Sequence, residues 1–118
     1  DQYQRALQLW SLLTLAARNQ QLLSYELVWQ LTGLAVVGLG QALDPVQSYC
    51  MVNHLPPLTA VVVSRVTGLP QEGFHLPDNY DGNVAAAQAS VFVYDWALTG
   101  HLHPKILQPF AMVRSRCL

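Results

Sequence analysis

Residues 24–74 read SYELVWQLTGLAVVGLGQALDPVQSYCMVNHLPPLTAVVVSRVTGLPQEGF, and the expected fold depends mainly on this segment. Ser24 is a candidate N-cap for a helix over residues 25–31, because its hydroxyl can accept a hydrogen bond from an otherwise unpaired backbone N–H. Gly33 stands where a helix commonly ends in a left-handed residue. A further helix is predicted over residues 34–43, although two glycines weaken it.

The residues directly after position 43 predict the start of a new helix. Asp44 can cap a helix, Pro45 suits a first turn that needs no hydrogen-bonded N–H, and Gln47 can reach back to the cap. We therefore expect a separate helix over residues 45–53, which ends before a pair of prolines. The β-branched run after them predicts a strand over residues 58–66 that is buried on both faces.

The last part of the segment predicts a hairpin. Residues 67–70 have the composition of a turn, and a second strand is expected over residues 72–76. Helix, turn, helix, helix, strand and hairpin follow one another in the order of a winged helix. The predicted fold class is therefore α+β: one mainly helical domain over residues 1–118 with a small antiparallel β-sheet, winged-helix-like over residues 24–76.

The flanking segments complete the domain. Residues 2–19 are predicted to form a largely buried helix, because apolar residues recur at steps of three and four. Residues 84–98 are ambiguous, since an alanine-rich half favours helix and a β-branched and aromatic half favours strand; we predict helix. Residues 100–118 are expected to form a C-terminal tail that packs on a partner subunit.

Charged side chains are scarce in this chain. They make up 11% of the residues, against about 25% in typical domains, whereas 52% of the residues are hydrophobic. A domain of 118 residues has much surface for its volume, so we expect some apolar surface to stay uncovered. Such patches usually meet another chain, and we therefore expect a homodimer or a larger homo-oligomer.

The charge distribution opposes nucleic-acid binding. Six basic residues are scattered along the chain, the formal net charge is −1, and Asp44 is the only fully charged residue between Leu27 and Ser64. Proteins that bind nucleic acid normally cluster Lys and Arg, because neutralising phosphates supplies most of the non-specific affinity. We therefore do not expect nucleic acid as a partner.

The cysteines and the apolar runs bear on the cellular compartment. Cys50 and Cys117 match neither a metal-ligand spacing nor a disulfide framework, so we expect reduced thiols in a cytoplasmic protein. The apolar runs are shorter than the roughly 20 residues of a membrane span, and no signal peptide is visible at the start. We therefore expect no membrane association.

Short motifs carry a family resemblance. The Ser-Tyr pair at residues 24–25, the LGQAL run at residues 39–43 and the Leu-Pro pair at residues 55–56 resemble the winged-helix domain of the alkylguanine-DNA alkyltransferases and their alkyltransferase-like relatives. The turn at Gly68, after a valine-rich run, is also similar to that family. The resemblance spans residues 24–74 and implies a winged-helix fold.

The residues that carry the family's chemistry are replaced in this chain. The nucleophilic cysteine of the family falls on Pro57, its histidine on Leu58 and the following arginine on Thr59. The arginine that the family inserts into the DNA stack falls on Val37. The resemblance therefore implies the fold without alkyl transfer or base flipping.

Two histidine-containing clusters could serve a metal or acid–base site. His75, Asp78 and Asp81 lie close together in a loop, although turn chemistry alone also explains aspartates there. His101 and His103 alternate, but no third ligand is adjacent to them. We expect no metal site and no cofactor.

Cys50 lies four residues before His54, so the two share a face if both are helical. A Cys–His pair can activate a thiolate nucleophile. Apolar surroundings, however, raise the pKa of a thiol and blunt its reactivity, which favours a structural cysteine.

The aromatic residues around Asp95 are the remaining candidates. Tyr94 and Trp96 flank this carboxylate, and they form either a cluster at a helix edge or the rim of a binding pocket, with Trp10 or Trp29 nearby. The residues that we name as a ligand-binding site are therefore Trp10, Trp29, Tyr94, Asp95 and Trp96.

The preferred function is a non-enzymatic binding or interaction module, a homodimer that recognises a small apolar ligand or a protein partner through apolar and aromatic surface. The low charge and the high apolar fraction support this interpretation, as does the lack of an assembled catalytic constellation in the sequence. An alternative is a DNA-binding winged-helix regulator, which the resemblance favours and the charge distribution opposes. A third hypothesis is a small hydrolase or transferase that uses Asp78, Asp81 or Cys50.

Overall fold

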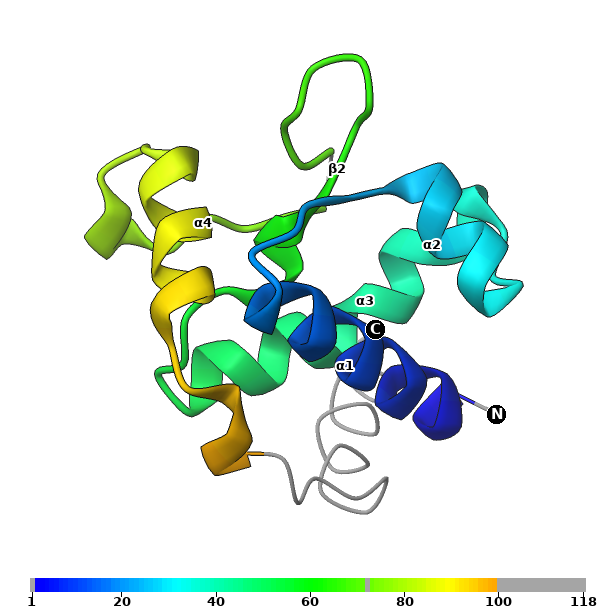
Figure 1. The fold of residues 1–118 in the computed structure, drawn as a ribbon, viewed down its shortest axis with the longest axis horizontal. Coiled ribbons are helices and arrows are strands. Elements are labelled where there is room, and N and C mark those ends of the chain that lie inside the picture. Colours follow the sequence, from blue (N-terminus) through cyan, green and yellow to red (C-terminus); the bar gives the residue numbers. More distant parts are fainter. Residues whose placement is uncertain (1, 72, 100–118) are drawn as a thin grey trace.

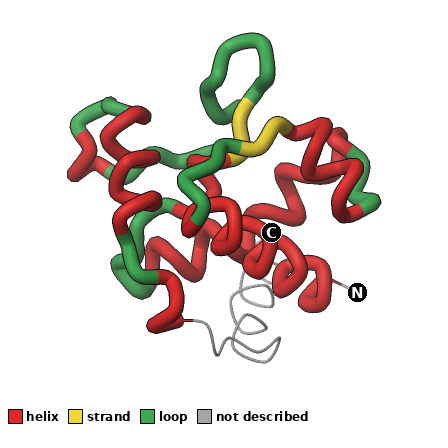
Figure 2. Tube along the Cα trace, viewed as in Figure 1, coloured by secondary structure: helices red, strands yellow, loops and turns green. Residues whose placement is uncertain are grey.

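The computed structural model of the chain describes residues 2–71 and 73–99 (Figure 1). These residues form α-helices, two very short strands and short 3₁₀-helices, so the predicted mainly helical α+β class is confirmed (Figure 2). In chain order the elements are α1 (Gln2–Arg18), β1 (Leu23–Ser24), α2 (Tyr25–Thr32), α3 (Val36–Val52), η1 (Leu58–Val61), β2 (Val62–Val63), η2 (Asp78–Tyr80), α4 (Val84–Val93) and η3 (Trp96–Thr99).

The predicted N-terminal helix is confirmed as α1. One face of it is buried, through Ala6, Leu9, Trp10, Leu13, Ala16 and Ala17. The helix is not largely buried as predicted, since Leu15 is exposed. α1 packs against α3 and η1, so its buried face lies in the centre of the core. Burial of this face stabilises the helix. At its C-terminal end the Gln21 N–H donates to the Ala16 carbonyl at 2.9 Å, and Gln20 has a left-handed φ of 56°.

Local capping signals place α2 as predicted. The Ser24 hydroxyl accepts a hydrogen bond from the Leu27 N–H at 3.0 Å, and the Gly33 N–H donates to the Trp29 carbonyl at 2.7 Å. Gly33 has a φ of 78°, in the left-handed region that glycine adopts without steric cost. A short turn then connects α2 to α3, which gives a helix-turn-helix arrangement.

α3 corrects the prediction of two helices divided at Asp44. One helix runs from Val36 to Val52 with Pro45 inside it, so Asp44 is not a capping residue. Proline in a helix interior removes one backbone hydrogen bond and costs roughly 3 kcal/mol when nothing offsets it. Burial offsets that cost here, because apolar residues on both sides of Pro45 form one continuous face in the core: Leu39, Leu43, Val46 and Cys50.

The predicted strand over residues 58–66 is largely wrong, because its first part forms η1 and only β2 is a strand. β2 pairs with β1 in parallel, with Leu23 opposite Val62, so the predicted antiparallel sheet is also wrong. Pairing stops after two residues because Ser24 already caps α2. The apolar run did indicate burial correctly, since residues 58–63 are all buried.

No hairpin follows β2 in the described residues, so the predicted wing is wrong (Figure 1). The chain instead closes a loop on itself, in which the Ser64 N–H donates to the Leu69 carbonyl at 2.9 Å. The Gln71 N–H donates to the Tyr25 hydroxyl at 2.9 Å and fastens this loop to α2. Backbone groups that a hairpin would pair are used in these contacts, and the described part of the second strand predicted over residues 72–76 has no strand structure.

The ambiguous segment 84–98 is helical in its first part, as predicted. The Asn83 side-chain oxygen accepts a hydrogen bond from the Ala86 N–H at 3.0 Å and caps α4. α4 ends at Val93, Tyr94 has an extended backbone, and η3 follows. Of the residues that favoured strand, 91–93 therefore lie in the last turn of α4, and only Tyr94 is extended.

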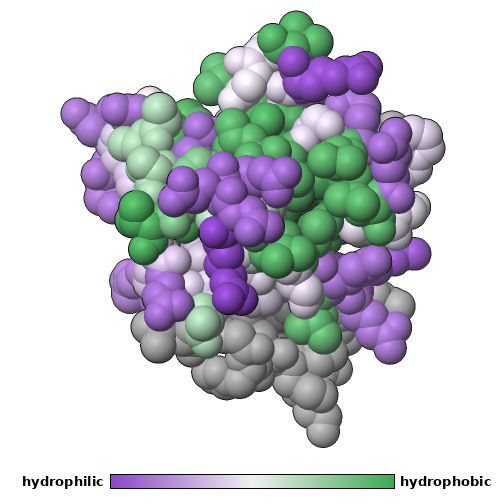
Figure 3. All heavy atoms as spheres, in the orientation of Figure 1, coloured by the Kyte–Doolittle hydropathy of each residue, from purple (hydrophilic) through white to green (hydrophobic). Residues whose placement is uncertain are grey.

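Buried residues of α1, α3, η1 and α4 form one hydrophobic cluster. Hydrophobic residues also reach the surface of the described chain (Figure 3), and the large exposed ones are Leu15, Leu22, Trp29, Leu31, Met51, Val52, Val66, Leu69 and Val93.

No helix among the described residues is long and apolar enough to cross a membrane. The C-terminal tail predicted at residues 100–118 lies outside the described residues.

Candidate functional site

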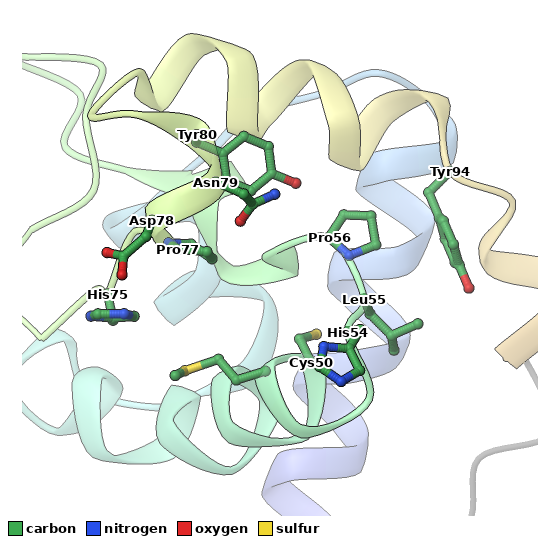
Figure 4. A pocket seen from close by; sticks show the side chains of 11 residues that line it. Cys50, His54, Leu55, Pro56, His75, Pro77, Asp78, Asn79, Tyr80 and Tyr94 are labelled. Carbon is green, nitrogen blue, oxygen red and sulfur yellow. The ribbon is translucent and has the colours of Figure 1, made fainter.

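A pocket of about 540 Å³ lies at the C-terminal end of α3 (Figure 4). It is bounded by the end of α3 and the residues that follow it, by residues 75–80, which include η2, and by Tyr94 after α4. Its lining combines apolar and aromatic side chains with two imidazoles, one carboxylate, one amide and a thiol. We call it the α3–η2 pocket.

The end of α3 places His54 in the lining of this pocket. The His54 N–H donates to the Met51 carbonyl at 3.3 Å, and the Leu55 N–H donates to the Cys50 carbonyl at 2.9 Å. These two bonds form a Schellman motif, in which the left-handed position is usually glycine. His54 occupies that position with a φ of 56°, a conformation that costs a non-glycine residue roughly 1–2 kcal/mol.

Gln47 holds the loop before η2 against α3. Its side-chain oxygen accepts a hydrogen bond from the His75 N–H at 2.7 Å, and its amide nitrogen donates to the Gly73 carbonyl at 3.2 Å. Gln47 is thus not the capping residue predicted from the sequence, because α3 continues through this position. The side chain instead bridges two segments that are separated by more than twenty residues in the chain.

Tyr80 is fixed by a chain of hydrogen bonds to α4. Its hydroxyl lies 2.7 Å from Ser90 Oγ, which itself donates to the Ala87 carbonyl at 2.6 Å. Because serine has a single hydroxyl hydrogen, the Tyr80 hydroxyl is the donor in the first bond. Its hydrogen is thereby used, and Tyr80 is one of the two tyrosines that line the pocket (Figure 4).

Cys50 is a buried thiol in the pocket lining, with 1% of its surface exposed. Burial raises the pKa of this thiol to about 12, while a hydrogen bond with the Leu58 backbone acts in the opposite direction and is the smaller effect. The expected rise in pKa is confirmed, so the thiol stays protonated at neutral pH. His54 lines the same pocket, but a protonated, buried thiol is not an activated nucleophile.

The predicted His–Asp cluster is divided by the fold. His75 and Asp78 line the pocket, whereas Asp81 is not among the lining residues and takes a left-handed φ of 52° at the end of η2. Across residues 2–71 and 73–99, no group of three His, Cys, Asp or Glu side chains is placed to hold a metal ion. His101 and His103 lie outside the described residues.

Three of the five residues predicted to bind ligand do lie together. The Trp96 ring contacts the rings of Trp10 and Tyr94, with centroid distances of 5.7 and 4.6 Å. Trp96 is fully buried, and its Nε1 donates to the Val91 carbonyl at 2.8 Å. Tyr94 lines the α3–η2 pocket, whereas Trp10 and Trp96 line a smaller pocket of about 330 Å³ beside α1.

The other two predicted residues contribute to neither pocket. Trp29 lies on α2, and 49% of its surface is exposed. Asp95 is exposed, and its side-chain oxygen accepts a hydrogen bond from the Ala97 N–H at 3.1 Å, within the turn that leads into η3. Asp95 therefore has a local structural role, and Trp29 belongs to a different surface of the molecule.

Met51, Asn79 and Tyr80 line the pocket although the sequence did not mark them as site residues. Met51 resembles any other apolar residue near a helix end, and Asn79 any other polar residue of a loop. The placement of Tyr80 depends on Ser90, ten residues further along the chain. The one signal in the sequence was the loop composition around these positions, which indicates a turn and not a pocket.

Comparisons of the chain with models of known protein families, with curated proteins and with solved structures give no match.

Proposed function

We propose that this chain is a non-enzymatic binding module that holds a small, partly apolar ligand in the α3–η2 pocket. The supporting observation is the pocket itself, whose volume of about 540 Å³ lies within the range of about 300–1,000 Å³ typical of small-molecule sites. Mainly apolar and aromatic walls with a few polar groups are the usual composition of such sites. The proposal keeps Tyr94 as a ligand-binding residue and moves the site away from Trp10, Trp29, Asp95 and Trp96.

Two features support binding without catalysis. The Cys50 thiol is held protonated by burial, so it does not supply the thiolate that a nucleophilic mechanism requires. An activated nucleophile or base is normally oriented by a hydrogen bond to a third group. Among the described residues near the pocket, the two hydrogen bonds of Gln47 position backbone segments. They do not link catalytic side chains to one another.

Met51 provides a selective probe for the proposed site. The chain contains two methionines, of which Met51 lines the pocket and is 47% exposed. With ¹³C-labelled methionine methyl groups, we expect the Met51 NMR signal to shift saturably when indole, benzyl alcohol, benzylamine or benzoate is added. A Met51→Leu variant assigns the signal.

A Tyr94→Ala variant tests whether the compounds bind in this pocket, because it removes one aromatic wall of the pocket. We expect it to weaken binding of those compounds at least about threefold. Leu69→Ala is the control, since Leu69 is an exposed apolar residue of the loop after β2 and should leave binding unchanged. A Met51 signal that none of the four compounds shifts at millimolar concentration would show that the proposal is wrong.

We also propose that the chain forms a homodimer through its exposed hydrophobic surface. The large hydrophobic residues that stay exposed in the described chain support this, because an apolar surface of that kind usually meets another chain (Figure 3). Light scattering should give a mass of about twice the 13.1 kDa of one chain. A mass of 13.1 kDa at every concentration tested would show that the chain is a monomer.

A DNA-binding regulator is the second candidate, favoured by the helix-turn-helix arrangement of α2 and α3 and by the alkyltransferase resemblance. Residues 2–99 carry three basic and six acidic side chains, which opposes phosphate binding. Gel retardation with duplex DNA across salt concentrations distinguishes the two candidates, and we expect no binding at physiological salt. Salt-dependent binding that is lost on replacing Gln41 or Arg65 would make the regulator the better proposal.

A further inference from the structure

We propose that the ligand of the α3–η2 pocket carries an organic ammonium group on an apolar body. This inference rests on the function proposed above and names the chemical class of the ligand. Three features of the pocket support it: the charge of its lining, its place at a helix end and its aromatic rings.

The charge of the lining has one sign. Asp78 carries the one full charge among the described residues that line the pocket, and neither lysine nor arginine is among them. The pocket also lies at the C-terminal end of α3, where the helix dipole is equivalent to roughly half a negative charge. Both features favour a cationic group over a carboxylate or a phosphate.

Two tyrosine rings provide surface that cations bind. The hydroxyl hydrogen of Tyr80 is used in the bond to Ser90, so Tyr80 offers a ligand its ring and an acceptor oxygen. Figure 4 shows Tyr80 on one side of the pocket, between Asp78 at one end and Tyr94 at the other. An ammonium group near either ring gains a cation–π attraction. Near Tyr80, which follows Asp78 by two residues, the Asp78 carboxylate acts in the same direction.

The remaining lining suits an apolar body with N–H donors. Met51, Leu55 and Pro56 supply apolar surface next to the polar groups. His54 and His75 each offer a ring nitrogen that accepts an N–H hydrogen bond when the imidazole is neutral. An ammonium ligand therefore finds acceptors for its hydrogens, while its carbon atoms contact the apolar walls.

Three ring compounds of similar size and different charge test the inference. They are benzylamine, which is a cation at pH 8, neutral benzyl alcohol and anionic benzoate, and their dissociation constants are measured from the Met51 methyl shift at low salt. We expect benzylamine to bind about tenfold more tightly than benzyl alcohol, the effect of a cation–π contact and one carboxylate together. Benzoate should bind more weakly than either.

Asp78→Asn is expected to weaken benzylamine binding roughly threefold and to leave benzyl alcohol binding unchanged. Asp81→Asn is the matched control, because Asp81 lies on the same loop outside the pocket lining and asparagine tolerates its left-handed backbone. This control should alter neither compound.

The outcomes separate the two proposals. Benzyl alcohol or benzoate binding as tightly as benzylamine, or equal effects of Asp78→Asn and Asp81→Asn, would overturn the ammonium class and leave the pocket as a binding site. A shift of the Met51 signal with indole and with none of these three compounds would also overturn the ammonium class, whereas no shift with indole or with any of the three would overturn the function on which the inference rests.

Discussion

Burial of the Cys50 thiol predicts a specific weakening of the fold at alkaline pH. Its pKa is about 12 in the folded chain, against an ordinary value of 9.0. Above pH 9 the unfolded chain therefore gives up a proton that the folded chain retains, and the free energy of unfolding falls as the pH rises. The contribution is fully present below pH 9 and is lost progressively as the pH approaches 12.

The size of the effect follows from the two pKa values. Each pH unit between them costs about 1.4 kcal/mol of unfolding free energy. Between pH 8 and pH 10 the loss amounts to about 1.4 kcal/mol, because the unfolded thiol is only about one-tenth ionised at pH 8. This is a large share of the roughly 5–15 kcal/mol that stabilises a typical domain.

Urea unfolding followed by tryptophan fluorescence at pH 8, 9 and 10, under reducing conditions, measures this loss. Cys50→Ala is the control, because it removes the buried thiol and keeps Cys117 and every tyrosine. The unsubstituted chain should lose about 1.4 kcal/mol more than Cys50→Ala between pH 8 and pH 10. Profiles that run parallel within about 0.5 kcal/mol would refute the reasoning, since the thiol would then ionise as readily in the folded chain.

Three further substitutions test local features, each by urea unfolding at pH 7. Ser24→Ala removes the cap of α2 and should lower the free energy of unfolding by about 1 kcal/mol. His54→Gly relieves the left-handed backbone at the end of α3 and should raise it by about 1 kcal/mol. Trp96→Phe removes the hydrogen bond to the Val91 carbonyl and part of a buried ring, and should lower it by about 1–2 kcal/mol.

Each of these substitutions has a matched control. Ser24→Gly should cost only a few tenths of a kcal/mol, because glycine is a tolerated N-cap. His54→Ala should bring no gain, since alanine meets the same backbone cost as histidine. Trp29→Phe, at an exposed position, should change stability by less than about 0.5 kcal/mol. If a control changes stability as much as the substitution it accompanies, the cap, the left-handed backbone or the buried hydrogen bond is not the cause of the effect.

Local signals account for the elements that the sequence predicted correctly. Ser24 and Gly33 mark the two ends of α2 through hydrogen bonds to residues three or four positions away. The three- and four-residue spacing of apolar residues in α1 predicts which face of the helix is buried. The caps act within one turn of helix, and the periodicity of α1 agrees with the face that it buries, so at these places the local signals and the tertiary packing favour the same structure.

Pro45 shows how tertiary contacts override a local signal. It stands between Asp44 and Gln47 in a pattern that has every mark of a helix start, and yet α3 continues through it. Burial of one apolar face on both sides of the proline holds the helix together. The missing hairpin has a related cause, because the backbone groups of Ser64 and Gln71 bond within their own loop and to α2.

The α3–η2 pocket was only partly visible in the sequence. Five of its lining residues belong to separate clusters in the sequence: Cys50 with His54, His75 with Asp78, and Tyr94 with Trp96. Contacts between distant parts of the chain bring them together, notably those between α3 and the loop before η2 and between η2 and α4. Such pairings leave no periodic or compositional trace in a single sequence.

Composition and contacts between near neighbours were enough to establish the mainly helical class, the extents of α1 and α2, the burial of the valine-rich run and the scarcity of charge. Long-range packing set the course of α3 through Pro45, the parallel pairing of two short strands and the pocket at the end of α3. Each of these requires residues far apart in the chain to meet, and the free energy of such a contact depends on the packing of the whole molecule.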